Sequence, residues 1–343
     1  MKKYILEITV FICGAIGMIL ELIAARVLSP YVGSSNLIWT TIIGIMLTSM
    51  SLGYWIGGKK ADKNPNKDSL SDFILLGAIT ASLIPLFETI VVKQLSNISD
   101  NLVLVAMASA TIVFGIPSFV LATVSPFAVK LVDKEYINVG EVSGRISSLS
   151  TIGSIVGTFL GGFFLIPTFG TRTIIFGVVI VLLMLSILLH EKKDKKYFLL
   201  IAVIAISIIG FQAIGKVVFD RKNSDIIKDV DSEYSRIFVK QVAAKGTTYK
   251  TLQVDDGLES YIDEKTGKMG AEYLYYYNLA NYYLKNNKST LMIGGAAYTY
   301  PTYYLNNFKD KTIDVSEIDE KMTKLATSEF SLNTDNSRLH IYH

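Results

Sequence analysis

The sequence has almost no cysteine and very little histidine. Its 343 residues include one cysteine, Cys13, and three histidines, His190, His340 and His343. A single cysteine excludes a disulfide framework within the chain and a cysteine-based metal site. Three histidines in the whole chain are too few to suggest a histidine-rich metal site. We therefore expect no metal centre and no disulfide.

Charged residues are also scarce. They make up 18% of the chain, while 50% is hydrophobic and the mean hydropathy is +0.40; an ordinary soluble chain carries about 25% charge. The net charge is +5 over residues 1–216, from 17 basic and 12 acidic residues, and −2 over 217–343, from 16 and 18. Neither part has the strongly basic stripe of a nucleic-acid-binding protein. The expected partner of the first part is a lipid bilayer, and nucleic acid is not expected.

Long apolar segments separated by short polar loops make up residues 1–216. A transmembrane helix needs roughly 20 predominantly apolar residues. The first segment is too long and too rich in glutamate for a cleaved signal peptide, and no A-x-A-like site follows it. The sequence predicts an α-helical membrane bundle of about seven spans. They are 4–28, 36–58, 73–92, 101–130, 146–167, 171–190 and 197–215.

Basic residues are concentrated at the N-terminus and in alternate loops. Thirteen lie there, including those near residues 59–67, 130–145 and 192–196, whereas the opposite loops contain only Lys93 and Arg172. Basic loops face the cytoplasm, so we expect a multi-pass protein of the cell membrane with a cytoplasmic N-terminus. Seven spans would place residues 217–343 on the other side, unless the last segment does not cross. The side on which the C-terminal part lies stays open.

Two ionisable residues and several glycines stand out within the spans. Glu21 is costly in lipid, so it either has a partner on another helix or serves a substrate or proton. Arg26 is near the end of its span and can extend to the interface. Glycines four residues apart indicate either close helix packing or a flexible transport path. They are Gly53 and Gly57, and Gly153, Gly157 and Gly161.

After residue 216 the pattern changes to short strands and helices. Two strands, 235–243 and 249–255, predict a hairpin around Gly246, and another strand is expected at 258–262. The alternation that follows indicates a parallel sheet with crossover helices. Residues 217–343 are therefore predicted to form an incomplete α/β Rossmann-like, methyltransferase-like domain with a small N-terminal hairpin. Its elements are a helix at 271–285, a strand at 290–293, a helix at 300–308, a strand at 312–316, a helix capped by Asp319 and ending near 330, and a strand from 338.

A glycine pair ends the first of these parallel strands, and an acid ends the second. Gly294 and Gly295 let a ligand approach the backbone, and Glu317 lies 22 residues beyond Gly295. This spacing suits a carboxylate that binds the hydroxyls of a ribose. The structural alternatives are a plain tight turn and a solvated strand end. Together the two features predict a nucleoside site.

Several motifs occur in the order found in one enzyme family. The chain resembles the spermidine synthase family of aminopropyltransferases in its membrane-fused bacterial form, over most of its length. In the membrane part the similar segments are 20–39, 52–63 and 144–172. In the rest they are SEYSRIFV (232–239), LQVDDGLES (252–260), AEYLYYY (271–277), LMIGGAAYTYP (291–301) and VSEIDEKMTKLATSEF (315–330).

The resemblance implies a reaction and a set of site residues. An aminopropyl group would pass from decarboxylated S-adenosylmethionine, the co-substrate, to a diamine such as putrescine, with no other cofactor. Glu317 would hold the ribose hydroxyls, Gly294 and Gly295 would admit the nucleoside, and Glu272 matches an acid of the substrate-lining helix. The ligands would be a nucleoside-type molecule and a polyamine. Self-association into a homo-oligomer stays open.

The chain departs from the family pattern at three places. Ala297, followed by Tyr298, replaces an aspartate of the glycine loop; Tyr276 lies at the centre of a Tyr-Tyr-Tyr run where the family has Tyr-His-Glu; and Ser260 replaces a glutamine. Each change removes a polar group expected to hold the amine or the nucleoside. Tyrosines at 298, 300, 303 and 304 either offer cation–π faces or pack in the interior.

The family's catalytic aspartate corresponds to a position beyond His343. The expectation is therefore a C-terminally truncated chain that does not turn over as it stands. Two other functions remain open. One is a non-catalytic membrane carrier or sensor with a nucleoside- or polyamine-binding domain. The other is a methyltransferase that uses intact S-adenosylmethionine.

Overall fold

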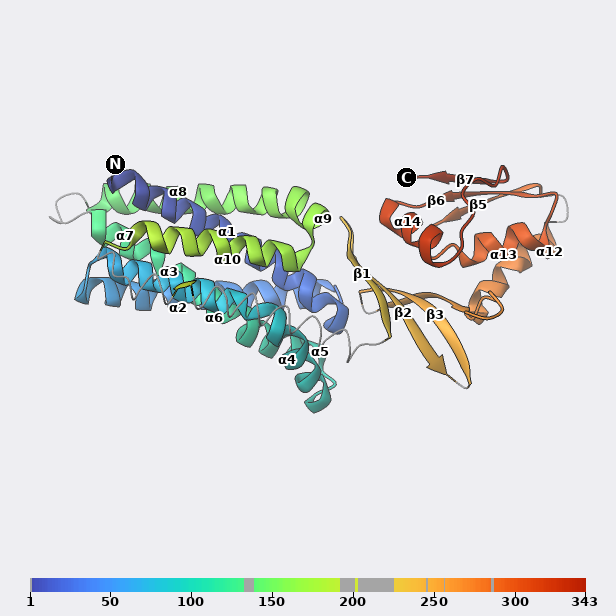
Figure 1. Cartoon of the computed structure of the whole chain (residues 1–343), viewed down its shortest axis with the longest axis horizontal. Helices are drawn as coiled ribbons and strands as arrows, with labels where there is room; N and C mark the ends of the chain where they lie inside the picture. The colour runs from blue at the N-terminus through green and yellow to red at the C-terminus, as the bar shows by residue number, and fades with distance from the viewer. Residues whose placement is uncertain are drawn as a thin grey trace. The chain divides into compact units, whose positions relative to one another are not determined.

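The chain forms two compact units, Met1–Phe219 and Asp220–His343. The computed structural model describes residues 2–132, 139–191, 201–202, 225–244, 246–255, 257–284 and 287–343. The described part of the first unit is helical throughout, and the second unit contains all the strands (Figure 1).

Six segments of the first unit are long and apolar enough to cross a membrane, among the residues described: Tyr4–Val32, Asn36–Lys63, Lys67–Glu88, Leu102–Val132, Val139–Phe169 and Thr171–Leu189. The predicted helical bundle is confirmed at this level. The seventh predicted span, 197–215, lies outside the described residues except for 201 and 202. The helices are α1 Lys2–Val32, α2 Asn36–Lys63, α3 Lys67–Ser82, α4 Ile84–Ile98, α5 Leu102–Ser109, α6 Ile116–Ala122, α7 Val124–Val132, α8 Val139–Phe159, α9 Ile166–Phe169 and α10 Thr171–Leu189.

Prolines interrupt three spans that the sequence analysis treated as continuous. The span predicted at 73–92 is two helices, α3 and α4, which meet at Leu83 just before Pro85. Two π-helical turns, η1 (Ala110–Gly115) and η2 (Leu160–Leu165), directly precede the turns that contain Pro117 and Pro167. Proline has no N–H to donate to the carbonyl four residues earlier, so the helix breaks or changes its hydrogen-bond period there.

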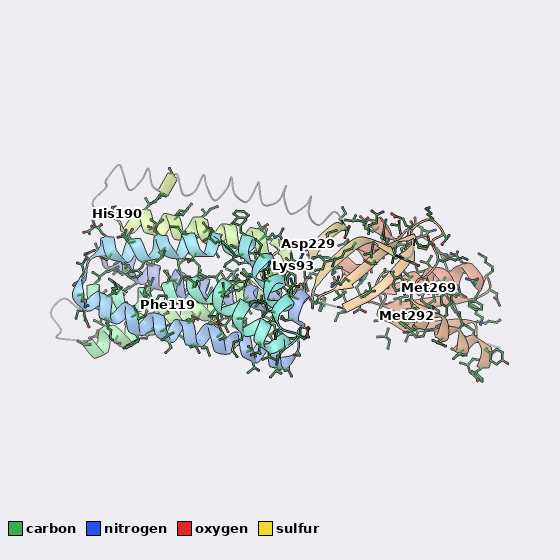
Figure 2. The ribbon with its side chains drawn as sticks, turned by 90° about the horizontal axis from the view of Figure 1, so that it is seen from below. Lys93, Phe119, His190, Asp229, Met269 and Met292 are labelled. Carbon is green, nitrogen blue, oxygen red and sulfur yellow. The ribbon has the colours of Figure 1, made fainter. Side chains whose placement is uncertain are left out.

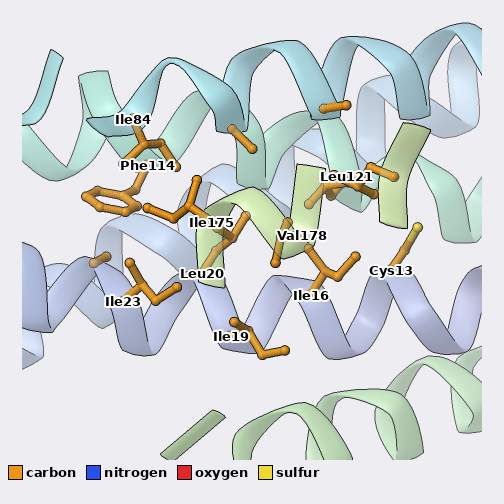
Figure 3. Close-up of a cluster of buried hydrophobic side chains, with 14 of the residues drawn as sticks. Cys13, Ile16, Ile19, Leu20, Ile23, Ile84, Phe114, Leu121, Ile175 and Val178 are labelled. Carbon is orange, nitrogen blue, oxygen red and sulfur yellow. The ribbon is translucent and has the colours of Figure 1, made fainter. Parts of the chain in front are cut away.

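The bundle core is formed by side chains of α1 packed against several other helices. Leu20 and Ile23 of α1 are fully buried, and Phe114 and Ile175 belong to the same cluster (Figure 3). In lipid, helices gain little from the hydrophobic effect, so close packing and dispersion contacts hold such a core together.

The glycines four residues apart lie at the closest helix contacts. A β-carbon added at Gly153 or Gly157 of α8 would overlap main-chain atoms of Phe11 or Ala15 on α1. A β-carbon added at Gly53 of α2 would likewise overlap the main chain of Phe119 on α6. Phe119 is labelled in Figure 2. This geometry supports the close-packing interpretation of the glycine pairs.

The second unit begins with a four-stranded antiparallel sheet in the order β1-β2-β3-β4. The strands are β1 Ile226–Asp231, β2 Arg236–Ala244, β3 Thr247–Val254 and β4 Gly257–Asp263. The predicted hairpin is β2–β3, in which Val239 pairs with Leu252. The sequence analysis missed β1, whose segment IIKDVD has no regular apolar alternation.

A three-stranded parallel sheet in the order β5-β6-β7 follows. Its strands are β5 Ser289–Ile293, β6 Thr312–Ser316 and β7 Leu339–Tyr342, and the crossover helices α13 (Thr299–Asn307) and α14 (Glu320–Glu329) lie on one side of it (Figure 1). As predicted, Asp319 caps α14 by accepting from the N–H of Lys321. The helix predicted at 271–285 is instead a 3₁₀ helix, η3 (Glu272–Tyr277), followed by the short α12 (Asn278–Tyr283).

The glycine contact between α1 and α8 predicts a position-specific effect of bulk. We expect Gly157→Leu to separate the two helices and to destabilise the bundle by about 1–3 kcal/mol, the usual cost of overpacking. Gly177→Leu on α10 is the matched control, because no atom lies within 4 Å of an added β-carbon there. Thermal unfolding of the full chain in detergent measures both variants. Equal melting temperatures would show that the contact does not hold the bundle.

Candidate functional site

A cavity of about 290 Å³ lies where β5 and β6 end, at their carboxyl termini. Ligands of open α/β sheets bind outside the carboxyl ends of the strands. Strand ends, the loop after β5, β4 and η3 all contribute to its wall. The lining residues are Val254, Glu259, Ser260, Tyr273, Leu274, Tyr277, Met292, Ile293, Gly294, Gly295, Ala296, Thr299, Tyr300, Glu317 and Met322.

The glycine pair forms the floor of a sharp turn after β5. Gly294 has a φ of +83°, in the left-handed region that favours glycine. Its N–H donates to the carbonyl of Ser316 at 2.8 Å and so continues the ladder with β6. A β-carbon at Gly295 would overlap the ring of Tyr298. The turn therefore needs glycine at both positions, and it leaves the backbone open to the cavity.

Glu317 is held against this turn. One carboxylate oxygen, Oε2, accepts from the N–H groups of Gly295 at 2.7 Å and Ala296 at 3.3 Å. The other, Oε1, accepts from the N–H of Asp319 at 2.9 Å. The residue is only 6% exposed. The structure thus brings together the two features that lie 22 residues apart in the sequence, and it excludes the solvated strand end as the account of Glu317.

The charge of the cavity is one-sided. Glu259 and Glu317 are both in the lining, and the residues described there include no lysine, arginine or histidine. Side chains of Ser260, Thr299 and Tyr277 add hydroxyl groups. Such a lining favours a ligand that carries positive charge and can donate hydrogen bonds.

A β-bulge directs Glu259 into the site, which is why the sequence analysis missed it. Leu252 of β3 pairs with Ser260, but the next residue, Gln253, pairs with Leu258. Glu259 is the extra residue between these pairs, and a bulge re-aims side chains away from strict alternation. Strict strand alternation would place Glu259 and Ser260 on opposite faces, whereas both line the cavity.

Aromatic rings form the wall contributed by η3 and α13. Tyr277 and Tyr300 meet edge to face, with ring centroids 5.2 Å apart. Burial raises the pKa of Tyr300 to about 12, and neighbouring Tyr304 adds to the shift. Both rings are in the lining, so a neutral phenol and an aromatic surface border the cavity at physiological pH.

Two predicted site residues, Ala297 and Tyr298, are core residues instead. Tyr298 is fully buried, and its hydroxyl lies 2.7 Å from the Thr323 hydroxyl. Ala297 packs in the cluster that contains Ile237 and Leu325. Neither residue is in the lining. Tyr298 adopts the left-handed backbone conformation, with φ +54°. Its ring contacts Gly295, at the place where a β-carbon of that residue would lie.

Two residues of η3, Glu272 and Tyr276, also lie outside the lining. The 3₁₀ helix has three residues per turn, which places Leu274 and Tyr277 on the cavity side. Tyr276 is 70% exposed and Glu272 is exposed as well. Both residues were expected in the site only because the family resemblance implied it.

The polar residues predicted in the first span lie in the helical bundle. Glu21 and Arg26 are both half-buried on α1. Within the described part of the chain Glu21 has no hydrogen-bond or ion-pair partner. The partner on another helix that one interpretation required is therefore not found among those residues.

The buried hydroxyl of Tyr298 predicts a stability effect without a binding effect. We expect Tyr298→Phe to cost about 1–2 kcal/mol of unfolding free energy, because the Thr323 hydroxyl loses its buried partner. Tyr276→Phe, at an exposed position, is the control. Denaturant unfolding of the full chain, followed by near-ultraviolet circular dichroism, measures the change. An unaltered midpoint would contradict the assignment of Tyr298 to the core.

The same residue has a consequence for alkaline pH. Burial raises the pKa of Tyr298 from 10.0 to about 12, so the folded state favours the neutral phenol. Its contribution to stability is complete below pH 10 and is lost as the pH rises through the folded pKa. Tyr298→Phe should therefore lose less stability than the parent chain between pH 10 and pH 12.

Comparisons with known proteins identify no relative: no protein-family model matches the chain, and searches of curated proteins and of solved structures return no match.

Proposed function

We propose that the chain is a membrane-bound, aminopropyltransferase-like protein whose second unit binds a cationic adenosine nucleoside of the decarboxylated S-adenosylmethionine type. The observation that carries the proposal is the buried Glu317 carboxylate, hydrogen-bonded to the Gly295 turn at the ends of two parallel strands. The proposed Rossmann-like, methyltransferase-like character of the incomplete sheet rests on the same geometry.

Glu317 has the chemistry that a ribose requires. A carboxylate is an acceptor with about four lone-pair sites. Three backbone N–H groups occupy part of this capacity and fix the orientation of the group. The remaining lone pairs suit two neighbouring hydroxyl donors, and the apolar side chains of Met292 and Met322 offer contacts to an adenine ring.

The one-sided charge favours an aminopropyl donor over a methyl donor. Decarboxylated S-adenosylmethionine carries a sulfonium and an ammonium group, and both are cationic. Intact S-adenosylmethionine adds a carboxylate, which would meet Glu259 and Glu317 without a basic residue in the described lining. We assign Glu259 to the ammonium group and the rings of Tyr277 and Tyr300 to the sulfonium.

The proposed reaction is a displacement at carbon. The acceptor amine forms a C–N bond to the propyl carbon attached to sulfur, the C–S bond breaks, and the electron pair leaves on methylthioadenosine as a neutral thioether. The amine then gives up a proton to a base. We assign no described residue to that base.

The first test is nucleoside binding. We expect Glu317→Gln to weaken methylthioadenosine binding by about 10- to 100-fold, because charge-assisted hydrogen bonds to both ribose hydroxyls are lost. Glu320→Gln is the matched control, since Glu320 is an exposed acid on α14 that pairs with Lys324. Isothermal titration of the full chain in detergent gives both constants. Failure of the parent chain to bind methylthioadenosine would refute the proposal.

The second test separates the two ends of the ligand. We expect Glu259→Gln to weaken the binding of decarboxylated S-adenosylmethionine by about tenfold, because one charge-assisted hydrogen bond to the ammonium group is lost. The binding of methylthioadenosine should not change. Methylthioadenosine lacks the ammonium group, so it serves as the internal control. Tighter binding of intact than of decarboxylated S-adenosylmethionine would contradict the charge argument and favour a methyltransferase.

A carrier or sensor that binds a nucleoside without chemistry is the second candidate function. The unusual tyrosine-rich wall, which lacks the polar groups of the resembled family, favours it. Mass spectrometry of the reaction with putrescine distinguishes the two: spermidine and methylthioadenosine appear for the enzyme, and unchanged substrates for the carrier or sensor.

A further inference from the structure

A larger cavity, of about 540 Å³, lies in the helical bundle among α2, α7 and α8. Its lining residues Gly58, Ala61 and Asp62 lie next to Lys59 and Lys63 in the last turns of α2. All its lining residues belong to the first unit. This cavity therefore shares no residue with the cavity of the second unit.

Hydroxyl groups without protein partners line this cavity. Most threonines of the spans donate to the carbonyl four residues earlier, as Thr48 and Thr111 do at 2.7 Å. Four serines and one tyrosine of the cavity differ: within the described part of the chain, their hydroxyl groups form no hydrogen bond to the protein. These hydroxyls are therefore available to a ligand. They are Ser125, Ser143, Ser147, Ser150 and Tyr54.

An ion pair stands among these hydroxyls. The ammonium of Lys130 on α7 lies 2.6 Å from a carboxylate oxygen of Asp62 on α2. Both residues line the cavity, and no other charged residue is in the described lining. Within the described lining, the cavity therefore presents one positive and one negative group, close together.

A proline and glycines make the room for this cavity. Pro126 has no N–H for the carbonyl of Ala122, and the helix turns at Thr123, between α6 and α7. A separate void of about 20 Å³ lies beside Gly14 and Gly17, and Tyr54, Ser125 and Ser150 line both spaces.

We propose that the cavity binds a small linear zwitterion, with its ammonium group on Asp62, its carboxylate on Lys130 and its chain among the serine hydroxyls. A ligand with two positive charges would place one against Lys130, and a ligand with two negative charges would place one against Asp62. Only opposite charges on one ligand replace the existing ion pair without leaving either group opposed by a like charge.

Four five-carbon ligands test the charge requirement at constant length. They are 5-aminovalerate, 1,5-diaminopentane, glutarate and 1,5-pentanediol. We expect radiolabelled 5-aminovalerate to bind the purified full chain in nanodiscs by equilibrium dialysis, and the other three to compete at least about tenfold more weakly, since each lacks one charge-assisted contact. Tighter binding of the diamine, or no binding of any of the four, would overturn the proposal.

Variants then assign the binding to this cavity. Asp62→Asn and Lys130→Met should each weaken 5-aminovalerate binding about tenfold or more. The controls are Glu141→Gln and Lys63→Met, exposed residues at the same end of the bundle that are outside the lining. The exchange Asp62→Lys with Lys130→Asp restores the pair, so it should fold and retain binding even if a single variant misfolds. Unchanged binding in both single variants would place the ligand elsewhere.

Discussion

The hydrogen bonds between the Glu317 carboxylate and the turn after β5 are the constraint on which the second unit's site depends. Two neighbouring parallel strands end side by side, and the turn after the first must be tight enough to bring its N–H groups to the acid that ends the second. The left-handed φ of Gly294 and the missing β-carbon of Gly295 make this approach possible. The carboxylate is then fixed before any ligand arrives, so ordering it costs a ligand little.

A comparable constraint governs the bundle, where glycine also sets the distance between main chains. In α8, Gly153 and Gly157 let the helix contact the backbone of α1 directly. Such contacts stabilise helix pairs in lipid through dispersion, because burial of apolar surface gains little there. The prolines act in the opposite direction. They break the hydrogen-bond period and separate segments locally, which is how a polar cavity arises beside a tightly packed interface.

Much of this arrangement was predictable from local sequence, and the misses have definite causes. Apolar length identified the six long helices, and short apolar runs between polar turns identified β2, β3 and the parallel strands. The spacing of Gly295 and Glu317 identified the two halves of the site. The misses lie where the backbone departs from regular geometry. Glu259, which was not predicted, lines the cavity at a bulge, and Tyr276 and Tyr298, which the resemblance implied, lie outside the lining on a 3₁₀ helix and at a left-handed turn. Tertiary packing decides these positions, and a single sequence does not encode it locally.

The two cavities differ in charge, and this difference gives each a distinct ligand chemistry. The site of the second unit is lined by two carboxylates with no base in the described lining, whereas the bundle cavity pairs one acid with one base. The charges of the lining select a ligand by its own charge rather than by its size. A ligand group next to a partly desolvated side chain of the same charge is strongly unfavourable. A polycation is therefore suited to the first cavity and opposed in the second by Lys130. Under the two proposals the bundle cavity selects a zwitterion and the cavity of the second unit selects a cation, so the two sites do not compete for one ligand.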